Sequence, residues 1–348
     1  MNTQSDDAVV PQTAPPTDVA GAPPGSGSAG GQRMVKLPFN LGRVRLQDYG
    51  LVGAIIVLVI AGTVLKPGIF LTSGNLFGGG GILDESAVIG LMAIGMTFVI
   101  ATAGIDLSVG SALSCAGVVG AQVAARGSIP VILVILATAV AIGVANGVLI
   151  AYGRIVAFIA TLAMLSIASG IALRVSHQTP VDLFGLDTLQ KFGTGHVLGI
   201  PAGELIFAIA AIAGWVLLNR TRYGRHVVAV GGNQEAARIA GVPVRRIIFS
   251  VYVLLGLCVG IAAVVQTGLL SSASPVAGTG FELSAIGAVV IGDTSLFGGR
   301  ATIVDTVLGV ITFELIFNLM TLMNLPIEIQ QITKGLIIIA AVLIQRRQ

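Results

Sequence analysis

Residues 231–270 read GGNQEAARIAGVPVRRIIFSVYVLLGLCVGIAAVVQTGLL. The first part of this stretch is polar and rich in small residues. Residues 245–269, by contrast, form an apolar run long enough to cross a lipid bilayer, which takes about 20 residues. Another apolar run, residues 201–218, lies before the polar part. A chain that alternates in this way between long apolar runs and short polar connections is typical of an all-α polytopic membrane protein.

The composition of the chain favours the same class. The 348 residues are 55% hydrophobic and only 10% charged, with a mean hydropathy of +0.96, whereas about 25% of the residues of a soluble domain are charged. The net charge of +3 is small and the basic residues are scattered, so nucleic acid is not an expected partner. Cys115 and Cys258 both lie in apolar runs, where we expect buried and inert thiols.

We predict about ten transmembrane helices, one for each apolar run that the sequence contains. Glycine and polar residues crowd the ends of the third and the eighth run, so eight or nine spans remain an alternative. The GxxxG pairs Gly143–Gly147 and Gly256–Gly260 are expected to mark helix contacts. The predicted spans are 49–65, 83–103, 107–125, 129–152, 155–175, 201–218, 245–269, 283–297, 302–322 and 327–344.

The N-terminal part of the chain differs from the rest. Residues 1–32 are rich in Pro, Gly, Ser and Ala and contain no apolar run, so they cannot bury enough surface to offset the entropy of ordering. We therefore predict a disordered cytoplasmic tail over residues 1–45 and a transmembrane domain over residues 46–348. The tail lacks the basic and apolar regions of a signal peptide, so the first span is expected to direct the chain to the membrane.

The positive charges predict the orientation. With a cytoplasmic N-terminus, ten spans place most of the 19 Lys and Arg residues on the cytoplasmic side, as the positive-inside rule requires. Both termini are then cytoplasmic, because an odd number of spans would put the C-terminal Arg pair on the opposite side. The cytoplasmic groups are Arg33, Lys36, Arg43 and Arg45, then Arg154, the loop 219–244 with the adjoining Arg245 and Arg246, then Arg300, and finally Arg346 and Arg347.

The loop 219–244 is the largest cytoplasmic connection, and it contains a predicted short helix over residues 233–241. Asn233 is a favourable N-cap, Glu235 lies in the first turn where the helix dipole favours an anion, and Gly241 ends the helix. The small residues Ala236 and Ala237 would let another protein approach closely, and Arg238 adds a charge.

Such a helix at the membrane surface suits a cleft on a partner protein. The alternative is an interfacial helix that lies on lipid, and the small number of large apolar residues counts against it. The residues predicted to form this coupling surface are Asn233, Glu235, Ala236, Ala237, Arg238 and Gly241.

Polar residues within predicted spans are candidates for a solute pathway. Asp106 and Ser108 lie in a glycine-bounded break, AGIDLSVG, which could be an unwound site on the pathway. The alternative is a tight turn in which Asp106 caps the next helix through the amide of Ser108 or Val109.

Four further polar residues lie within spans. Glu314 and Asn318 are four residues apart and so share one helix face, and Asn146 and Gln266 are amides in the middle of their runs. They could line a pathway for a neutral solute or form hydrogen bonds between helices. Lys334 could pair with Glu314 or extend to an interface.

Four stretches resemble one known family. They are GIDLSVGS at 104–111, NRTRYGRHVVAVGGNQEAARIAGVPVRR at 219–246, GFELSAIGAVVIGDTSLFGGR at 280–300 and QQITKGLIIIAAVLI at 330–344. In this order they are similar to the membrane-spanning permeases of ribose-type ABC importers, which carry monosaccharides into bacteria. The chain departs from the pattern at Asp293 and Asp305, where glycine is expected, and we expect Asp305 near an interface or inside the bundle.

The resemblance implies a permease subunit in the bacterial inner membrane that carries a pentose, a hexose or a related polyol. It implies that residues 233–241 dock on a separate cytoplasmic ATP-binding subunit and that a periplasmic sugar-binding protein delivers the solute. We expect a second copy of the chain, because a single bundle would leave half of a paired ATPase unused. The expected surroundings are therefore lipid, two protein partners and another copy.

The sequence contains no motif for nucleotide binding or catalysis. No G-x-x-x-x-G-K-[ST] occurs, so ATP and Mg are expected on the partner ATPase and no cofactor or metal on this chain. The three histidines do not have metal-ligand spacing, and no catalytic residue is predicted. The alternative to a permease subunit is a secondary transporter driven by an ion gradient, with Asp106 and Glu314 as coupling carboxylates.

Overall fold

The computed structural model of the chain describes residues 50–78 and 81–345. The chain divides into two units, Met1–Val44 and Arg45–Gln348, and all described residues belong to the second. The predicted tail, residues 1–45, and the C-terminal pair Arg346 and Arg347 lie outside the described residues.

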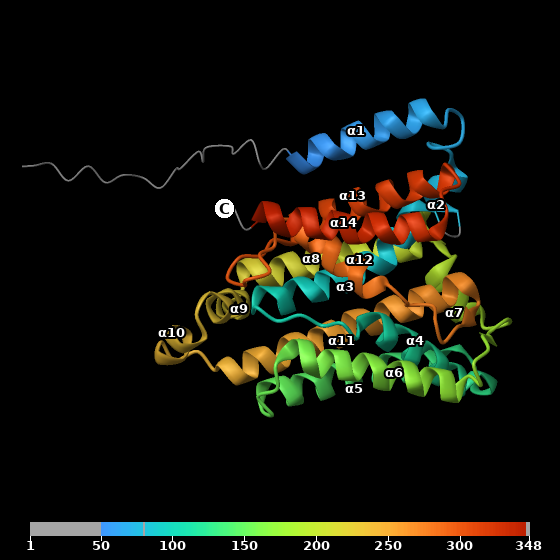
Figure 1. The fold of residues 1–348 in the computed structure, drawn as a ribbon. Coiled ribbons are helices and arrows are strands. Elements are labelled where there is room, and N and C mark those ends of the chain that lie inside the picture. Colours follow the sequence, from blue (N-terminus) through green and yellow to red (C-terminus); the bar gives the residue numbers. More distant parts are fainter. Residues whose placement is uncertain (1–49, 79–80, 346–348) are drawn as a thin grey trace, which may run out of the picture. The chain divides into compact units, whose positions relative to one another are not determined.

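The described residues fold into α-helices that lie alongside one another, with a few two-residue strands in the connections (Figure 1). The all-α prediction is therefore confirmed. The elements are α1 (Gly50–Leu65), α2 (Ser73–Phe77), α3 (Ile82–Ala101), α4 (Val109–Ala121), η2 (Ala124–Arg126), α5 (Ser128–Ala151), α6 (Ala157–Val175), β1 (Val181–Asp182), α7 (Asp187–Gly193), β2 (His196–Val197), β3 (Ile200–Pro201), α8 (Ala202–Arg220), α9 (Arg222–Gly232), α10 (Gln234–Ile239), α11 (Val244–Leu270), β4 (Ser272–Ala273), α12 (Phe281–Ile291), α13 (Ile303–Leu322) and α14 (Ile327–Gln345).

Each predicted span contains one helix, but two of the spans are wrong in extent. Among the described residues, six helices are long and apolar enough to cross a membrane: α3, α5, α6, α8, α11 and α13. The predicted spans 107–125 and 283–297 contain only the 13-residue helix α4 and the 11-residue helix α12. These helices measure about 20 Å and 17 Å at 1.5 Å per residue, which is less than the thickness of a hydrocarbon core of about 30 Å.

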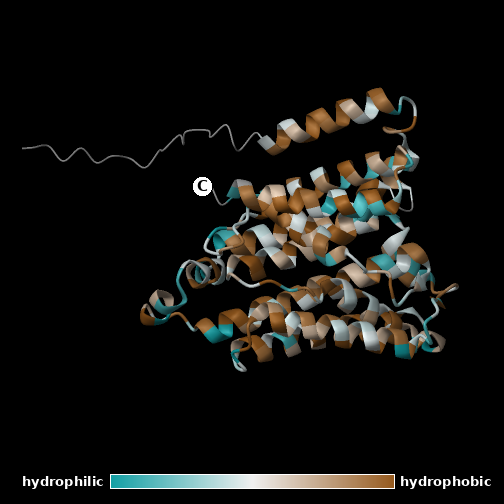
Figure 2. Cartoon of the chain, viewed as in Figure 1, coloured by the Kyte–Doolittle hydropathy of each residue, from teal (hydrophilic) through white to brown (hydrophobic). Residues whose placement is uncertain are grey.

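The connections predicted to be cytoplasmic gather at one end of the bundle. Figure 1 shows α9, α10 and the last turns of α14 at this end, which we call the α10 end, with α2 and α7 at the other. The amide of Gly299 donates to the carbonyl of Ala101 at 3.1 Å, which joins the connection after α12 to the end of α3. Hydrophilic residues concentrate toward the two ends and apolar residues cover the helices between them (Figure 2).

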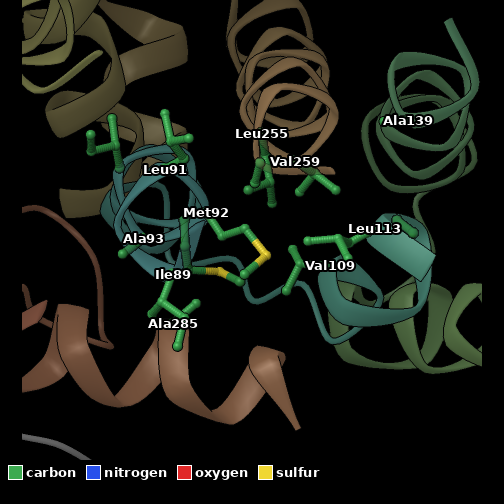
Figure 3. Packing of buried hydrophobic residues seen from close by; sticks show 14 of the residues in the cluster. Ile89, Leu91, Met92, Ala93, Val109, Leu113, Ala139, Leu255, Val259 and Ala285 are labelled. Carbon is green, nitrogen blue, oxygen red and sulfur yellow. The ribbon is translucent and has the colours of Figure 1, made fainter. Parts of the chain in front are cut away.

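The helix α11 is the centre of the packing. It lies against α3, α4 and α5, and the two GxxxG motifs face each other, because a Cβ added to Gly143 would lie 3.0 Å from the Cα of Gly256. The expectation that these motifs mark a helix contact is confirmed. Figure 3 shows the neighbouring core, in which Met92 of α3 lies between α11 and Val109 of α4.

Two stretches without helix enter the interior of the bundle, residues 102–108 before α4 and residues 274–280 before α12. The first runs alongside the helices from the α10 end (Figure 1). The second stretch meets the first turn of α4 at Gly278 and Gly110, where a Cβ on either residue would overlap the carbonyl oxygen of the other. The amide of Gly278 also donates to the hydroxyl of Ser114 at 2.8 Å, so this contact joins α4 to the segment before α12.

The two aspartates that depart from the family pattern both lie at helix ends. Asp293 follows α12 with a φ of 57° and forms an ion pair with Arg300. Asp305 lies in the first turn of α13, where its carboxylate accepts a hydrogen bond from the hydroxyl of Thr302 at 2.8 Å. The same hydroxyl accepts from the amide of Asp305 at 3.0 Å, so the pair caps the helix.

Replacing Gly110 with Ala is expected to destabilise the protein by about 1–3 kcal/mol, the usual cost of overpacking. The new methyl group would overlap backbone atoms of Gly278, which cannot move aside as a flexible side chain could. Gly170→Ala in α6 is the matched control, because nothing lies within 4 Å of the added Cβ. Thermal unfolding in detergent measures the effect, and equal melting temperatures for the two variants would contradict this contact.

Candidate coupling surface and transport pathway

The short helix α10 forms as its sequence predicts. The side chain of Asn233 accepts a hydrogen bond from the amide of Ala236 at 2.9 Å, which is the expected N-cap. The helix covers six residues, Gln234–Ile239, and Gly241 follows it with a φ of 83°. A side chain at Gly241 would be strained in this left-handed conformation, so glycine is required there to turn the chain toward α11.

One face of α10 is exposed. Arg238 donates two hydrogen bonds to the carboxylate of Glu235, at 2.9 Å and 2.5 Å, and this pairing lowers the pKa of the Glu235 carboxyl. Ile239 is 76% exposed and adds apolar surface to this face. Because this face combines exposed charges with exposed apolar surface, contact with a protein partner is more favourable for it than contact with water.

The prediction that Ala237 lies on the docking surface is wrong. Ala237 is only 4% exposed and belongs to the hydrophobic core of its own chain. It holds α10 against α9, whereas Ala236 is exposed. The sequence argument treated the small residues as one face, but at 100° per residue adjacent alanines of a helix point in different directions.

The helix α9 was missed, since residues 222–232 were taken as part of the loop. Thr221 accepts a hydrogen bond from the amide of Gly224 at 3.2 Å and so caps the helix. Val227 and Val230 are buried at a helical spacing. The sequence signal was therefore present, a Thr N-cap followed by apolar residues three apart, but the helix is too short to resemble a span.

A cleft of about 490 Å³ opens beside α10. Gln234, Glu235 and Arg238 form one wall of it, and Tyr252 of α11 forms another. The unwound segment contributes through residues 102–104. Three arginines line this α10 cleft together with a single acidic residue, so that its net charge is positive; they are Arg154, Arg238 and Arg245.

Asp106, Ser108 and Asn146 form a buried polar cluster. The carboxylate of Asp106 accepts hydrogen bonds from the amide and the hydroxyl of Ser108, at 2.8 Å and 2.6 Å, and from the side-chain amide of Asn146 at 3.0 Å. Asn146 also donates to the hydroxyl of Ser108 at 2.9 Å. All three residues are at most 3% exposed, and the space beside them measures only about 10 Å³. The cluster is therefore a packed joint between the unwound segment and α5.

The backbone of the unwound segment also finds partners. The carbonyl of Ile105 accepts hydrogen bonds from the hydroxyls of Thr161 in α6 and Tyr252 in α11, at 3.4 Å and 3.5 Å. Asn146 lies five residues before the end of α5, so the cluster is about 8 Å inside the bundle. Non-helical backbone at this depth is tolerated because protein surrounds it.

A second polar site lies between α3, α12, α13 and α14. Glu314 and Asn318 both line this polar cavity, which measures about 210 Å³, so the prediction that they share one face is confirmed. The amides of Asn318 and Asn75 form two reciprocal hydrogen bonds of 2.9 Å and 3.0 Å, which tie α13 to α2. Among the described residues, Lys334 forms no ion pair with Glu314; its ammonium donates to the hydroxyl of Ser284 at 2.7 Å.

The six predicted pathway residues therefore do not form one site. Asp106, Ser108 and Asn146 belong to the buried polar cluster, while Glu314 and Asn318 line the polar cavity. Gln266, half-buried on α11, lines neither. The contributions of Glu85 and Ser284 to the cavity were missed, because the cavity forms only where four separate helices meet.

The comparisons with known proteins agree with this architecture. Residues 80–342 match the family described as the permease component of the branched-chain amino acid transport system. The chain belongs to this family of permeases and is a multi-pass protein of the inner membrane, a transport subunit built of apolar helices.

Relatives that the chain resembles along most of its length include import permeases for sugars. The chain is 40% identical to the ribose import permease protein RbsC of Escherichia coli K12, over 85% of this chain and 92% of that protein. It is 39% identical to RbsC of Bacillus subtilis 168, over 87% and 94%, and 37% identical to the L-arabinose transport system permease protein AraH of Escherichia coli K12, over 92% and 96%. No solved structure matches the chain at a significant level.

Replacing Asn146 with Leu is expected to cost about 1–3 kcal/mol of stability, because two hydroxyl or carboxylate acceptors in a dry interior lose a donor. Asn219→Leu is the control, since Asn219 is exposed and its amide bonds only to the carbonyl of Trp215 in its own helix. Both melting temperatures are measured in detergent. A loss of transport without any loss of stability in Asn146→Leu would show that this residue serves the solute instead.

Proposed function

We propose that this chain is the membrane-spanning permease of an ATP-driven importer for a monosaccharide, a pentose, a hexose or a related polyol. The similarity to sugar import permeases over nearly their full length carries the proposal. A match of this length preserves the order of the spans and of the connections between them. The chain itself supplies the passage, and the energy comes from a separate subunit.

The exposed face of α10 supports docking of a cytoplasmic ATP-binding subunit. Ile239 offers apolar surface, and the pair of Glu235 and Arg238 offers matched charges at its side. The sequence contains no P-loop, so the partner binds ATP and Mg. A periplasmic sugar-binding protein and a second copy of this chain complete the proposed assembly, with both termini on the cytoplasmic side.

The contacts of the α10 cleft provide a route for coupling. Residues 102–104 and Tyr252 line the same cleft as Gln234, so a partner that enters the cleft beside α10 would also meet the unwound segment. The buried polar cluster fixes that segment to α5, and the contact of Gly110 with Gly278 continues to the segment before α12. A movement at the α10 cleft can thus be transmitted through contacts within the protein to α12, which lines the polar cavity.

The ion-driven alternative receives less support. It names Asp106 and Glu314 as carboxylates that bind one coupling ion. Asp106 is enclosed in the packed buried polar cluster, whereas Glu314 lines the polar cavity between other helices. The two carboxylates therefore do not face a common space.

Transport by the reconstituted assembly tests the proposal. Proteoliposomes containing this chain, its ATPase and its binding protein should take up a radiolabelled sugar from a panel that includes D-ribose and L-arabinose. Uptake should require ATP and continue after ionophores collapse the ion gradients. Uptake of leucine instead of any sugar, or uptake that stops with the ionophore alone, would overturn the proposal.

Replacing Ile239 with Ala is expected to weaken binding of the ATPase subunit by about 1–2 kcal/mol, roughly a factor of 5 to 30, if this side chain fills a pocket on the partner. Folding should not change, because the side chain is 76% exposed and Ala is a good helix former. The matched control is Leu198→Ala, an apolar residue that is 99% exposed in a different connection. Co-purification of the ATPase with each variant is measured, and equal recovery would place the docking surface elsewhere.

A further inference from the structure

The polar cavity between α3, α12, α13 and α14 is lined by both charged and aromatic side chains. Its walls combine carboxylates, an ammonium group, a hydroxyl and two phenyl rings; they include Glu85, Glu314, Lys334, Ser284, Phe313 and Phe317. Ionisable residues at membrane depth are costly, so their presence around an open space calls for a ligand rather than a packing role.

The carboxylates of the cavity are available to form hydrogen bonds with a ligand. Within residues 50–78 and 81–345, neither Glu85 nor Glu314 forms an ion pair or a side-chain hydrogen bond with another residue. Glu314 is nevertheless only 5% exposed, so its oxygens face the cavity and not the surface. A carboxyl group can accept several hydrogen bonds, so these oxygens are available to a ligand in the cavity.

The ammonium group of Lys334 is already held. It donates to the hydroxyl of Ser284 at 2.7 Å and lies 5.2 Å and 5.7 Å from the ring centroids of Phe317 and Phe313. The two rings are 4.6 Å apart and tilted by 42°, so together they form an apolar wall beside the ammonium. The cavity therefore offers free acceptors on one side and a fixed donor with an apolar surface on the other.

We propose that this cavity is a binding site for the transported saccharide inside the permease, an inference that rests on the proposed function. A saccharide carries several hydroxyl groups, each of which donates one hydrogen bond and accepts others, and an apolar C–H face. Its donors match the free carboxylates of Glu85 and Glu314, and its apolar face matches Phe313 and Phe317.

The size and the position of the cavity agree with this ligand. Pockets for drug-sized molecules measure about 300–1,000 Å³, so about 210 Å³ suits a smaller solute. The lining residues come from the first turns of α3, α12 and α14 and from the last turns of α13, which the predicted orientation places toward the periplasm. A saccharide released by a periplasmic binding protein would meet this site before the rest of the bundle.

Thiol labelling tests the site directly. Thr321 lines the cavity and its hydroxyl bonds only to the carbonyl of Phe317 in its own helix, so Thr321→Cys should fold normally. The native Cys115 and Cys258 are buried and should react slowly. The assembled transporter is treated with a polar methanethiosulfonate reagent, with and without D-ribose or L-arabinose. Ser73→Cys, an exposed position of α2 that does not line the cavity, is the control.

The expected result is a several-fold slower labelling of Thr321→Cys in the presence of the transported sugar, with no change for Ser73→Cys. Unchanged labelling of Thr321→Cys alongside ATP-dependent sugar uptake would overturn the site while the proposed function stands. Protection by leucine and not by sugars would overturn the ligand class. Absence of any ATP-dependent sugar uptake would overturn the proposed function and, with it, this site.

A second variant separates binding from assembly. Glu314→Gln keeps the shape of the side chain but replaces one acceptor oxygen of the carboxyl group with an amide donor, so the sugar concentration for half-maximal uptake should rise several-fold. Because Glu314 makes no contact at the α10 end, ATPase co-purification should stay at the level of the unmodified chain. An unchanged sugar concentration for half-maximal uptake would contradict a role of this carboxylate in binding.

Discussion

The contact between the backbones of Gly110 and Gly278 is the constraint on which the interior of this permease depends. In lipid every backbone polar group must find a partner within the protein, so chain without helix is tolerated only where other elements enclose it. Two such stretches lead into α4 and α12, and the second contacts the first turn of α4 at this pair of glycines. The close approach lets α4 and α12 begin inside the bundle and remain shorter than a full span.

The two candidate functional regions of the protein, the α10 cleft and the polar cavity, have different residues and lie in different parts of the bundle. The α10 cleft collects arginines and the exposed face of α10 at one end, where a partner with ATP would bind. The polar cavity contains carboxylates and aromatic rings and lies between the helices α3, α12, α13 and α14. The buried polar cluster around Asp106 lies between them, and its tight packing and several mutual hydrogen bonds suit a rigid link better than a binding site.

The sequence was sufficient to predict the class of fold and the residues that begin and end the short helix α10. Apolar runs of about 20 residues predict spans because only a helix satisfies its own backbone in lipid. The N-cap at Asn233 and the glycine at 241 act through contacts within a few residues, and both were predicted correctly. The two short spans were overestimated, because an apolar composition does not reveal where the chain leaves the helix.

Only the tertiary structure decided which polar residues act together. Asp106 and Asn146 are 40 residues apart, and Asn75 and Asn318 are 243 apart, so no local pattern connects them. The burial of Ala237 likewise depends on how α10 rests against α9. The sequence by itself determined that this is a polytopic membrane protein, because the bilayer acts on each segment separately. Only the packing of the helices against one another decided where the coupling surface and the cavity lie.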